Sequence, residues 1–355
     1  MGKVCSFRKG YGIAKDDLSS GGTPCILYGE LYTTYKTAIA KTIKSKTSIQ
    51  SKSLVYSQKD DVIIPCSGET AEDIATSICV PYDGVLLGGD LTIVHSDLDG
   101  AFLSNQINSV RKFDIARIAQ GKSIVHLQAD ELKKIFIFFP SIQEQRKISA
   151  FIDKIDERIE IQNKIIEDLK ILKKELNYSL IGRIINGKSS NCKIEDVIDY
   201  EQPTNYIVKS DKYIENGETP VLTANKAFLL GYTIENEGVY NKSDCIILDD
   251  FTLDFKYVNF PFKIKSSAIK ILTAKKDIEL RYFYEYLLFL GLTSHEHKRH
   301  YISEIAPLPL YLPSIDEQRS ALSALNSISE KIKVEENYII ALKAQKCFFL
   351  RAMFI

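Results

Sequence analysis

The heptapeptide PSIQEQR at 140–146 returns further along the chain as PSIDEQR at 313–319. Each copy follows a short apolar run with strand character, at 135–139 and 308–312, which the proline ends because it has no backbone N–H to continue a sheet. In both copies the serine and the glutamate fit the capping box S-x-x-E, in which the serine caps a helix and the glutamate reaches back. The sequence therefore predicts that a helix starts in the same way twice.

Apolar residues follow each copy at the three-and-four spacing of a helix seam. In the first helix these positions are Ile148, Ile152, Ile155, Ile159, Ile166, Leu169, Leu172 and Leu176. In the second they are Ala321, Leu325, Ile328, Ile332, Ile339, Leu342 and Phe349. Gln162 and Glu335 stand at the same seam position, where a polar residue can fix the register of a coiled coil. An amphipathic helix on an ordinary core would explain one copy but two copies poorly, so we predict that the pair packs as a long coiled coil of about 60 Å.

The repeat divides the chain into a globule, a long helix, a second globule and a second long helix. At 355 residues the chain is too long for one core, and we expect boundaries at 1–140, 141–187, 188–312 and 313–355. Strand-like runs at 62–64, 85–87, 91–94, 245–248 and 269–272 alternate with turn signals, so both globules are predicted to be mixed α/β domains. The predicted fold class is α+β.

Charge is segregated along the chain, although the net charge is zero. Residues 1–59 hold ten Lys or Arg against three acids, residues 60–110 hold nine acids and no Lys or Arg, and residues 255–276 hold six Lys and no acid. A DNA footprint needs only a local basic face, because phosphate contacts release counterions locally. Neutrality therefore does not exclude a DNA-binding protein, and it favours one that binds with the help of partners.

The cysteines and the apolar stretches favour a cytoplasmic protein. Seven cysteines are scattered, odd in number and never spaced C-x-x-C, which is typical of reduced thiols and of neither a disulfide framework nor a zinc site. No signal peptide is predicted at the start of the sequence. The most apolar stretch, 282–292, is too short to span a bilayer.

Several motifs together resemble the specificity subunit of type I restriction–modification systems. They are the repeated heptapeptide, then GYGIAK at 10–15, CILYGELY at 25–32 and AQGKSIVHL at 119–127 in the first globule, and YEQPT at 200–204, LDDFT at 248–252 and FKIKSSA at 262–268 in the second. The resemblance implies two target-recognition domains at opposite ends of an antiparallel coiled coil, with the helices setting the gap between two unlike half-sites of one asymmetric DNA target.

The same resemblance implies a chain without chemistry of its own. Two methyltransferase subunits, and restriction subunits that can join them, would dock on this scaffold and perform adenine-N6 methylation and ATP-dependent cleavage. S-adenosylmethionine, ATP and Mg²⁺ would belong to those partners, and this chain would bind no cofactor.

Candidate DNA contacts are chosen by chemistry, since Lys neutralises phosphate, Tyr bonds phosphate or stacks, and Arg and Gln have the donor geometry for guanine and adenine. In the first globule we predict Tyr32, Tyr35, Lys36, Lys41, Lys44, Lys46, Arg111, Arg117, Gln120 and Lys122. In the second we predict Lys256, Lys263, Lys265, Ser266, Ser267, Lys270, Lys298 and Arg299. The alternative is that these side chains form only a solvated face.

Three patterns suggest other functions but are rejected, and one alternative function is kept. The segment GRIINGKS at 182–189 satisfies the P-loop pattern, but a P-loop follows a strand, and here a long helix precedes, so we interpret its glycines as helix-ending residues. The segment HEHKRH at 295–300 could suggest a metal, but no cysteine lies near and we expect no metal site. A nuclease would need the acids at 249, 250 and 254, which the resemblance assigns to a recognition domain. A coiled-coil adaptor without a DNA role would leave the basic clusters unexplained.

Overall fold

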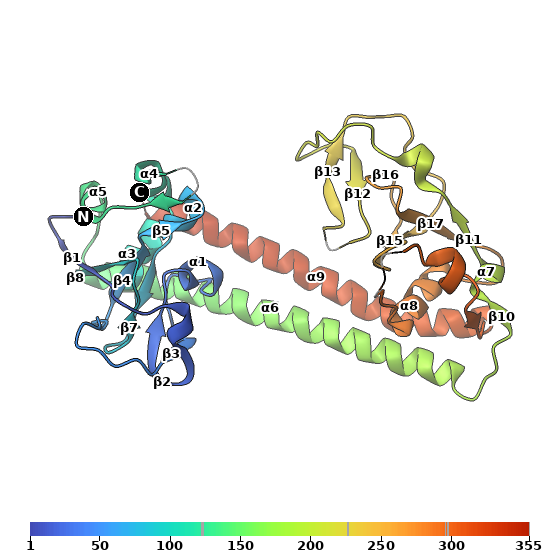
Figure 1. The fold of residues 1–355 in the computed structure, drawn as a ribbon, viewed down its shortest axis with the longest axis horizontal. Coiled ribbons are helices and arrows are strands. Elements are labelled where there is room, and N and C mark those ends of the chain that lie inside the picture. The colour runs from blue at the N-terminus through green and yellow to red at the C-terminus, as the bar shows by residue number, and fades with distance from the viewer. Residues whose placement is uncertain (122–123, 226, 295, 297, 355) are drawn as a thin grey trace. The chain divides into compact units, whose positions relative to one another are not determined.

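The chain forms two compact units in a computed structural model that describes residues 1–121, 124–225, 227–294, 296 and 298–354. Unit 1 comprises Met1–Lys164 and Glu336–Ile355, and unit 2 comprises Ile165–Glu335. Two long helices, α6 (Ile142–Ile185) and α9 (Ile315–Met353), each contribute a segment to both units (Figure 1). The α+β class and the two long helices predicted from the sequence are confirmed.

Unit 1 contains a four-stranded antiparallel sheet in the order β1-β8-β4-β6. Its strands are β1 (Cys5–Lys9), β8 (Leu91–Ser96), β4 (Asp61–Pro65) and β6 (Ile78–Val80). A second sheet pairs β2 (Leu18–Ile26) with β3 (Ser45–Thr47) antiparallel and with β7 (Leu86–Leu87) parallel. A short pair joins β5 (Ser67–Gly68) to β9 (Val125–His126). The helices of this globule are α1 (Glu30–Thr33), α2 (Ala71–Ile74), α3 (Gly100–Asn108), α4 (Lys112–Ile118) and α5 (Ala129–Lys134).

Unit 2 repeats this arrangement with a four-stranded antiparallel sheet in the order β11-β17-β14-β15. Its strands are β11 (Ile198–Glu201), β17 (Ile269–Ala274), β14 (Cys245–Asp249) and β15 (Phe255–Val258). In its second sheet β12 (Thr219–Leu222) pairs antiparallel with β13 (Leu229–Thr233) and parallel with β16 (Lys263–Ile264). A short pair joins β10 (Cys192–Lys193) to β18 (Pro309–Leu310). The helices are α7 (Ile194–Val197), α8 (Leu280–Leu290) and a π-helix at Tyr301–Ile305.

Both globules therefore have one topology, although the sequence repeat is visible only where the long helices begin. In each, the second strand of the four-stranded sheet, β8 or β17, leads into the globule's longest helix, α3 or α8. The predicted strands at 62–64, 91–94, 245–248 and 269–272 are confirmed, and β7 covers most of 85–87. The runs before the prolines differ from expectation: 135–139 forms no strand, and only Pro309–Leu310 of the second run pairs.

The first repeated glutamine joins α6 to its globule. Gln145 is 2% exposed. Its Nε2 donates to the carbonyl of Pro140 at 2.8 Å, and its Oε1 accepts the N–H of Asp99, the N-cap of α3, at 3.0 Å. The predicted cap is present as well, since Ser141 Oγ accepts the N–H of Glu144 at 3.4 Å. Backbone groups that would otherwise be buried without partners are thereby satisfied.

The second repeated glutamine makes the same joint between α9 and its globule. Gln318 is fully buried. It donates to the carbonyls of Pro313 at 2.9 Å and Asp277 at 3.0 Å, and it accepts the N–H of Glu279, the N-cap of α8, at 2.8 Å. The reciprocal arm of the capping box is present here too, because Ser314 N–H donates to the Glu317 carboxylate at 2.9 Å. We call Gln145 and Gln318 the glutamine joints.

The two long helices pack antiparallel within each unit. In unit 1 the rings of Phe151 and Phe349 lie 4.9 Å apart, and Asp156 pairs with Lys346 at 2.5 Å. The later residue on α6 thus contacts the earlier residue on α9, as expected for antiparallel helices. In unit 2 Ile181 belongs to one core cluster with α9 residues 321 and 322. Figure 1 shows the two helices side by side within each unit.

Most predicted seam residues are buried or half-buried. The buried members are Ile152, Ile155, Gln162, Ile166, Ala321, Leu325, Ile332, Ile339 and Leu342. The half-buried members are Ile148, Ile159, Leu169, Leu176, Ile328, Glu335 and Phe349. The prediction for Leu172 is wrong, because its side chain is 51% exposed. The seam passes instead through the neighbouring Lys173, whose ammonium pairs with the buried carboxylate of Glu285 on α8 at 2.9 Å.

The segment that matches the P-loop pattern lies at the end of α6. Gly182 is inside the helix, which ends at Ile185, and Gly187 adopts φ +71°, the left-handed conformation that commonly ends helices. No helix in the described part of the chain is both long and apolar enough to cross a membrane.

Candidate nucleic-acid interface

The basic loop of unit 1, residues 34–46, connects α1 to β3. Lys36, Lys44 and Lys46 are exposed, and the described chain offers none of them a carboxylate at ion-pair distance. Tyr35 is half-buried beneath them, and its hydroxyl accepts the N–H of Lys44 at 3.4 Å. Burial raises the pKa of Tyr35 to about 12, so its hydroxyl stays neutral. The loop thus presents three unpaired cations on a braced backbone, a surface suited to phosphates.

Lys41, in the same loop, has a different role from its neighbours. Its ammonium lies 2.6 Å from Asp153 and 3.0 Å from Glu157, both on α6. Partial burial alone would lower the pKa of Lys41, but its hydrogen bonds to these two carboxylates raise the pKa overall. Lys41 therefore holds the basic loop against the long helix and is a weaker candidate for phosphate contact.

The second predicted set of unit 1 lies around α4. Arg117 and Gln120 are exposed, and the backbone of Gln120 exchanges hydrogen bonds of 2.9 and 2.7 Å with His126. Arg111 is half-buried, with its guanidinium 3.4 Å from Asp114 and 5.5 Å from the ring of Phe138. Lys122 lies outside the described residues. The exposed members can reach a ligand, whereas Arg111 mainly packs the domain.

Two lysines predicted to contact DNA in unit 2 lie inside the fold. Lys263 and Lys270 are each 1% exposed. The ammonium of Lys263 lies 3.1 Å from Glu235, and that of Lys270 lies 3.5 Å from the buried carboxylate of Asp250. The expectation that Lys263 and Lys270 face DNA is therefore corrected: a buried ammonium must be paired within the protein, and neither has surface left for a phosphate.

The other predicted residues of unit 2 are nearer the surface, and several are already paired. Lys265 pairs with Asp211 and lies 5.6 Å from the ring of Tyr213. Lys298 lies 2.6 Å from Glu296 and 2.8 Å from Glu304, and these hydrogen bonds raise its pKa. Ser267 and Arg299 are exposed, while Lys256 and Ser266 are half-buried. Unit 2 thus offers fewer unpaired cations among these residues than the basic loop of unit 1.

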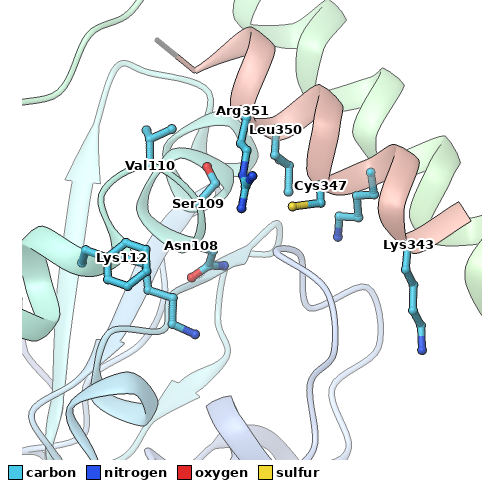
Figure 2. A pocket seen from close by; sticks show the side chains of 10 residues that line it. Asn108, Ser109, Val110, Lys112, Lys343, Cys347, Leu350 and Arg351 are labelled. Atoms are coloured by element: carbon cyan, nitrogen blue, oxygen red, sulfur yellow. The ribbon is translucent and has the colours of Figure 1, made fainter. Parts of the chain in front are cut away.

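Sequence reasoning missed two surface features of unit 1. One is a polar hollow between α1, β5 and β9, lined by Tyr28, Tyr32, Glu69, Asp90 and His126. The other is a groove between the end of α9 and the turn from α3 to α4 (Figure 2). The only sequence signal for the polar hollow was the acidic composition of 60–110. The groove had no local signal, because it joins segments far apart in the sequence.

The groove of Figure 2 combines cationic and apolar side chains. Lys112, Lys343, Lys346 and Arg351 line it together with Phe113, which is 79% exposed. None of its lining residues is acidic. A groove of this composition suits an acidic protein surface that also carries apolar side chains.

Metal ligands do not converge in the described part of the chain, where no group of three His, Cys, Asp or Glu could hold an ion. His295 and His297 of the segment considered above lie outside the described residues. His300 is buried, and its ring contacts Ser294 and Glu304. The seven cysteines are free.

Comparison with known proteins finds a family match over somewhat less than half of the chain. Residues 1–170 match the family described as Type I restriction modification DNA specificity domain. The Escherichia coli protein "Type I restriction enzyme EcoR124I/EcoR124II specificity subunit" is 40% identical over 161 residues, which are 43% of this chain and 39% of that protein. The match thus spans about two fifths of the curated relative's length.

Two solved structures share the fold over almost the whole chain. The S subunit of a type I restriction–modification system from M. genitalium has a TM-score of 0.62 and 16% identity, and covers 99% of this chain and 94% of its own. A second structure, from work on complex assembly and conformational transition of the type I R-M system, has a TM-score of 0.60 and 15% identity, covering 99% and 95%. At these identities the likeness establishes the fold.

Proposed function

We propose that the chain is the DNA-recognition subunit of a type I restriction–modification complex, because residues 1–170 match the DNA specificity domain of that family and the chain shares the fold of solved type I S subunits. The observation that carries this proposal is the family match over residues 1–170. Two recognition domains, 1–140 and 188–312, would each read one half of a split target. Because the two domains differ in sequence, the target would be asymmetric.

The basic loop of unit 1 supports this proposal. Lys36, Lys44 and Lys46 are exposed together, and cations concentrated in this way supply the sequence-independent part of DNA affinity. Arg117 and Gln120 add exposed side chains with the donor geometry for base edges. In unit 2, Arg299, Ser267 and the half-buried Lys256 remain candidates after the removal of the buried lysines.

Exposed apolar side chains on the long helices support a scaffolding role. In unit 1 Ile161, Ile340 and Phe348 are 60%, 65% and 66% exposed, and in unit 2 Ile171 and Val334 are 52% and 57% exposed. These side chains lie along both long helices, and we propose them as contacts for partner proteins. The methyltransferase subunits, and restriction subunits where present, would dock on these helices, and the groove of Figure 2 would add contacts to an acidic partner surface.

On this proposal the chain performs no chemistry. The methyltransferase partner would bind S-adenosylmethionine and methylate adenine N6, and the restriction partner would use ATP and Mg²⁺ for cleavage. The chain would act in the cytoplasm, where its free cysteines stay reduced.

The test is to map methylated adenines in DNA from cells that express this chain with its cognate methyltransferase subunit. We expect methylation at one split, asymmetric motif, and none at that motif when either protein is omitted. Methylation without a motif, or the same motif without this chain, would refute the proposal.

A further inference from the structure

The acidic run at 60–110 contains carboxylates with structural partners and exposed carboxylates without a cation, and two of the exposed ones line the same hollow. Asp61 is buried and pairs with two basic side chains of the sheet, while Asp73 and Asp99 accept hydrogen bonds at the starts of α2 and α3. Glu69 and Asp90 are exposed, and no cation of the described chain pairs with either. An unpaired carboxylate in a DNA-binding domain repels phosphate, so its presence needs a reason.

Glu69 and Asp90 share one hollow of about 370 Å³. Glu69 directly follows β5, and β5 pairs with β9 so that Ser67 lies opposite His126. His126 therefore lines the same hollow as Glu69. Asp90 is held in the left-handed region at φ +57°, with its carbonyl accepting a backbone N–H at 2.7 Å and its carboxylate accepting the Ser67 hydroxyl at 3.2 Å. The two carboxylates therefore project from fixed backbone into one space.

Tyrosines form the opposite wall of this hollow. Tyr28 is 37% exposed and Tyr32 is half-buried on α1, where burial and then the charges of nearby acids raise its pKa. Both hydroxyls can donate hydrogen bonds, and both rings can stack. The basic loop begins two residues after Tyr32, so phosphate-binding cations directly adjoin the hollow along the chain.

The donor and acceptor chemistry of the hollow selects one base. A carboxylate can only accept hydrogen bonds, and in the major groove cytosine presents its N4 amino group as a donor. Adenine adds the N7 acceptor beside its amino group, and guanine and thymine present acceptors that a carboxylate repels. His126 is exposed at the rim and can donate to the O6 or N7 of the paired guanine.

We infer that the hollow formed by Glu69, Asp90, Tyr28, Tyr32 and His126 reads a cytosine–guanine pair in the half-site bound by the first recognition domain. Glu69 accepts the one N4 hydrogen of cytosine that base pairing leaves free, and the charge of Asp90, which Ser67 holds beside it, disfavours a base that presents an acceptor there. The tyrosines and His126 fix the base pair beside them. The inference rests on the proposed function and adds the chemical identity of one base to it.

The test compares sequence selection by the full chain, with its methyltransferase partner, from a pool of random DNA duplexes. The wild-type complex should require cytosine at one position of one half-site. Glu69→Gln and Asp90→Asn keep shape and remove charge, and Asn tolerates the left-handed backbone at 90. Each variant should weaken the cytosine preference at that single position by about tenfold, and Glu69→Gln should gain affinity for adenine, which glutamine reads.

Glu72→Gln is the matched control, because Glu72 is an equally exposed acid on α2 that does not line the hollow. This variant should select the wild-type motif. An unchanged motif in both hollow variants, or loss of the whole motif, would overturn the inference while leaving the proposed function in place. A wild-type complex without any sequence preference would overturn the proposed function itself, and the inference with it.

Discussion

Units 1 and 2 have the same topology and the same glutamine joint, but they use their lysines differently. Unit 1 keeps Lys36, Lys44 and Lys46 on its surface, whereas unit 2 places Lys263 and Lys270 inside its fold beside buried or half-buried carboxylates. Both groups looked alike in the sequence, as runs of lysine without acids. The comparison teaches that a run of charge indicates a surface only when the acids that could pair with it are far away in space as well as in sequence.

The largest effect is expected from breaking the buried pair of unit 2. Asp250 accepts the backbone N–H groups of residues 300 and 301 and lies beside Lys270, so Asp250→Ala leaves a buried ammonium with the amide oxygen of Gln202 but without a neutralising carboxylate. We expect the free energy of unfolding to fall by about 3–5 kcal/mol, measured by urea denaturation. Asp254→Ala, at an exposed acid of the same loop, should cost little. Equal losses in both variants would mean that the pair does not stabilise unit 2.

The next effect tests whether the two units share one joint. Gln145→Ala and Gln318→Ala each leave buried backbone groups without partners, and each should lower the free energy of unfolding by about 1–3 kcal/mol. Gln143→Ala, at an exposed position in the first turn of α6, serves as the control and should change stability little. If only one of the two variants lost stability, the two glutamines would not be equivalent.

DNA binding should separate exposed from buried lysines. The double variant Lys36→Ala/Lys44→Ala should weaken binding to all duplexes, and should reduce the slope of log affinity against log salt by at most roughly two units. Lys263→Ala should leave the slope unchanged, because its ammonium already pairs with Glu235. Fluorescence anisotropy with labelled duplex between about 50 and 200 mM salt measures both. A reduced slope in Lys263→Ala would contradict the burial argument.

The smallest effect is a pH dependence in unit 2. The hydrogen bond from His300 to Glu304 raises the pKa of His300 above its ordinary value of 6.5, with Lys298 also facing Glu304. The folded state therefore favours the protonated ring, and this stabilisation is complete below pH 6.5 and is lost as the pH rises through the folded-state value. The melting temperature of the wild-type protein should fall over this range more than that of His300→Gln. Calorimetry from about pH 6 to about 9 measures the melting temperatures of both proteins. Melting temperatures that fall in parallel would contradict the role of His300.

The long helices could be predicted because their signals are local. The capping serines, the apolar spacing and the repeat all lie within a few turns of one another, and the structure confirms them except at Leu172. That error has a physical cause: position 173, seven residues after Ile166, continues the heptad spacing, but it holds a lysine whose partner Glu285 is more than a hundred residues away.

The candidate DNA surface was less predictable because it depends on such distant partners. The pairing of Lys41 with α6 and of Lys263 with Glu235 cannot be inferred from composition, since burial and pairing are set by the tertiary fold. The hollow at Glu69 and Asp90 was hidden for the same reason, because α1, β5 and β9 meet only in the folded domain.

The glutamine joints contact their globules only through main-chain atoms: carbonyls at 140, 277 and 313, and amides at 99 and 279. Each helix adds one bond that does depend on a side chain, because Ser149 on α6 donates to the Asp99 carboxylate and Arg319 on α9 donates to the Glu279 carboxylate. A globule of different sequence that kept this backbone path and one acid at the start of the helix could therefore be joined to the same long helix without altering it.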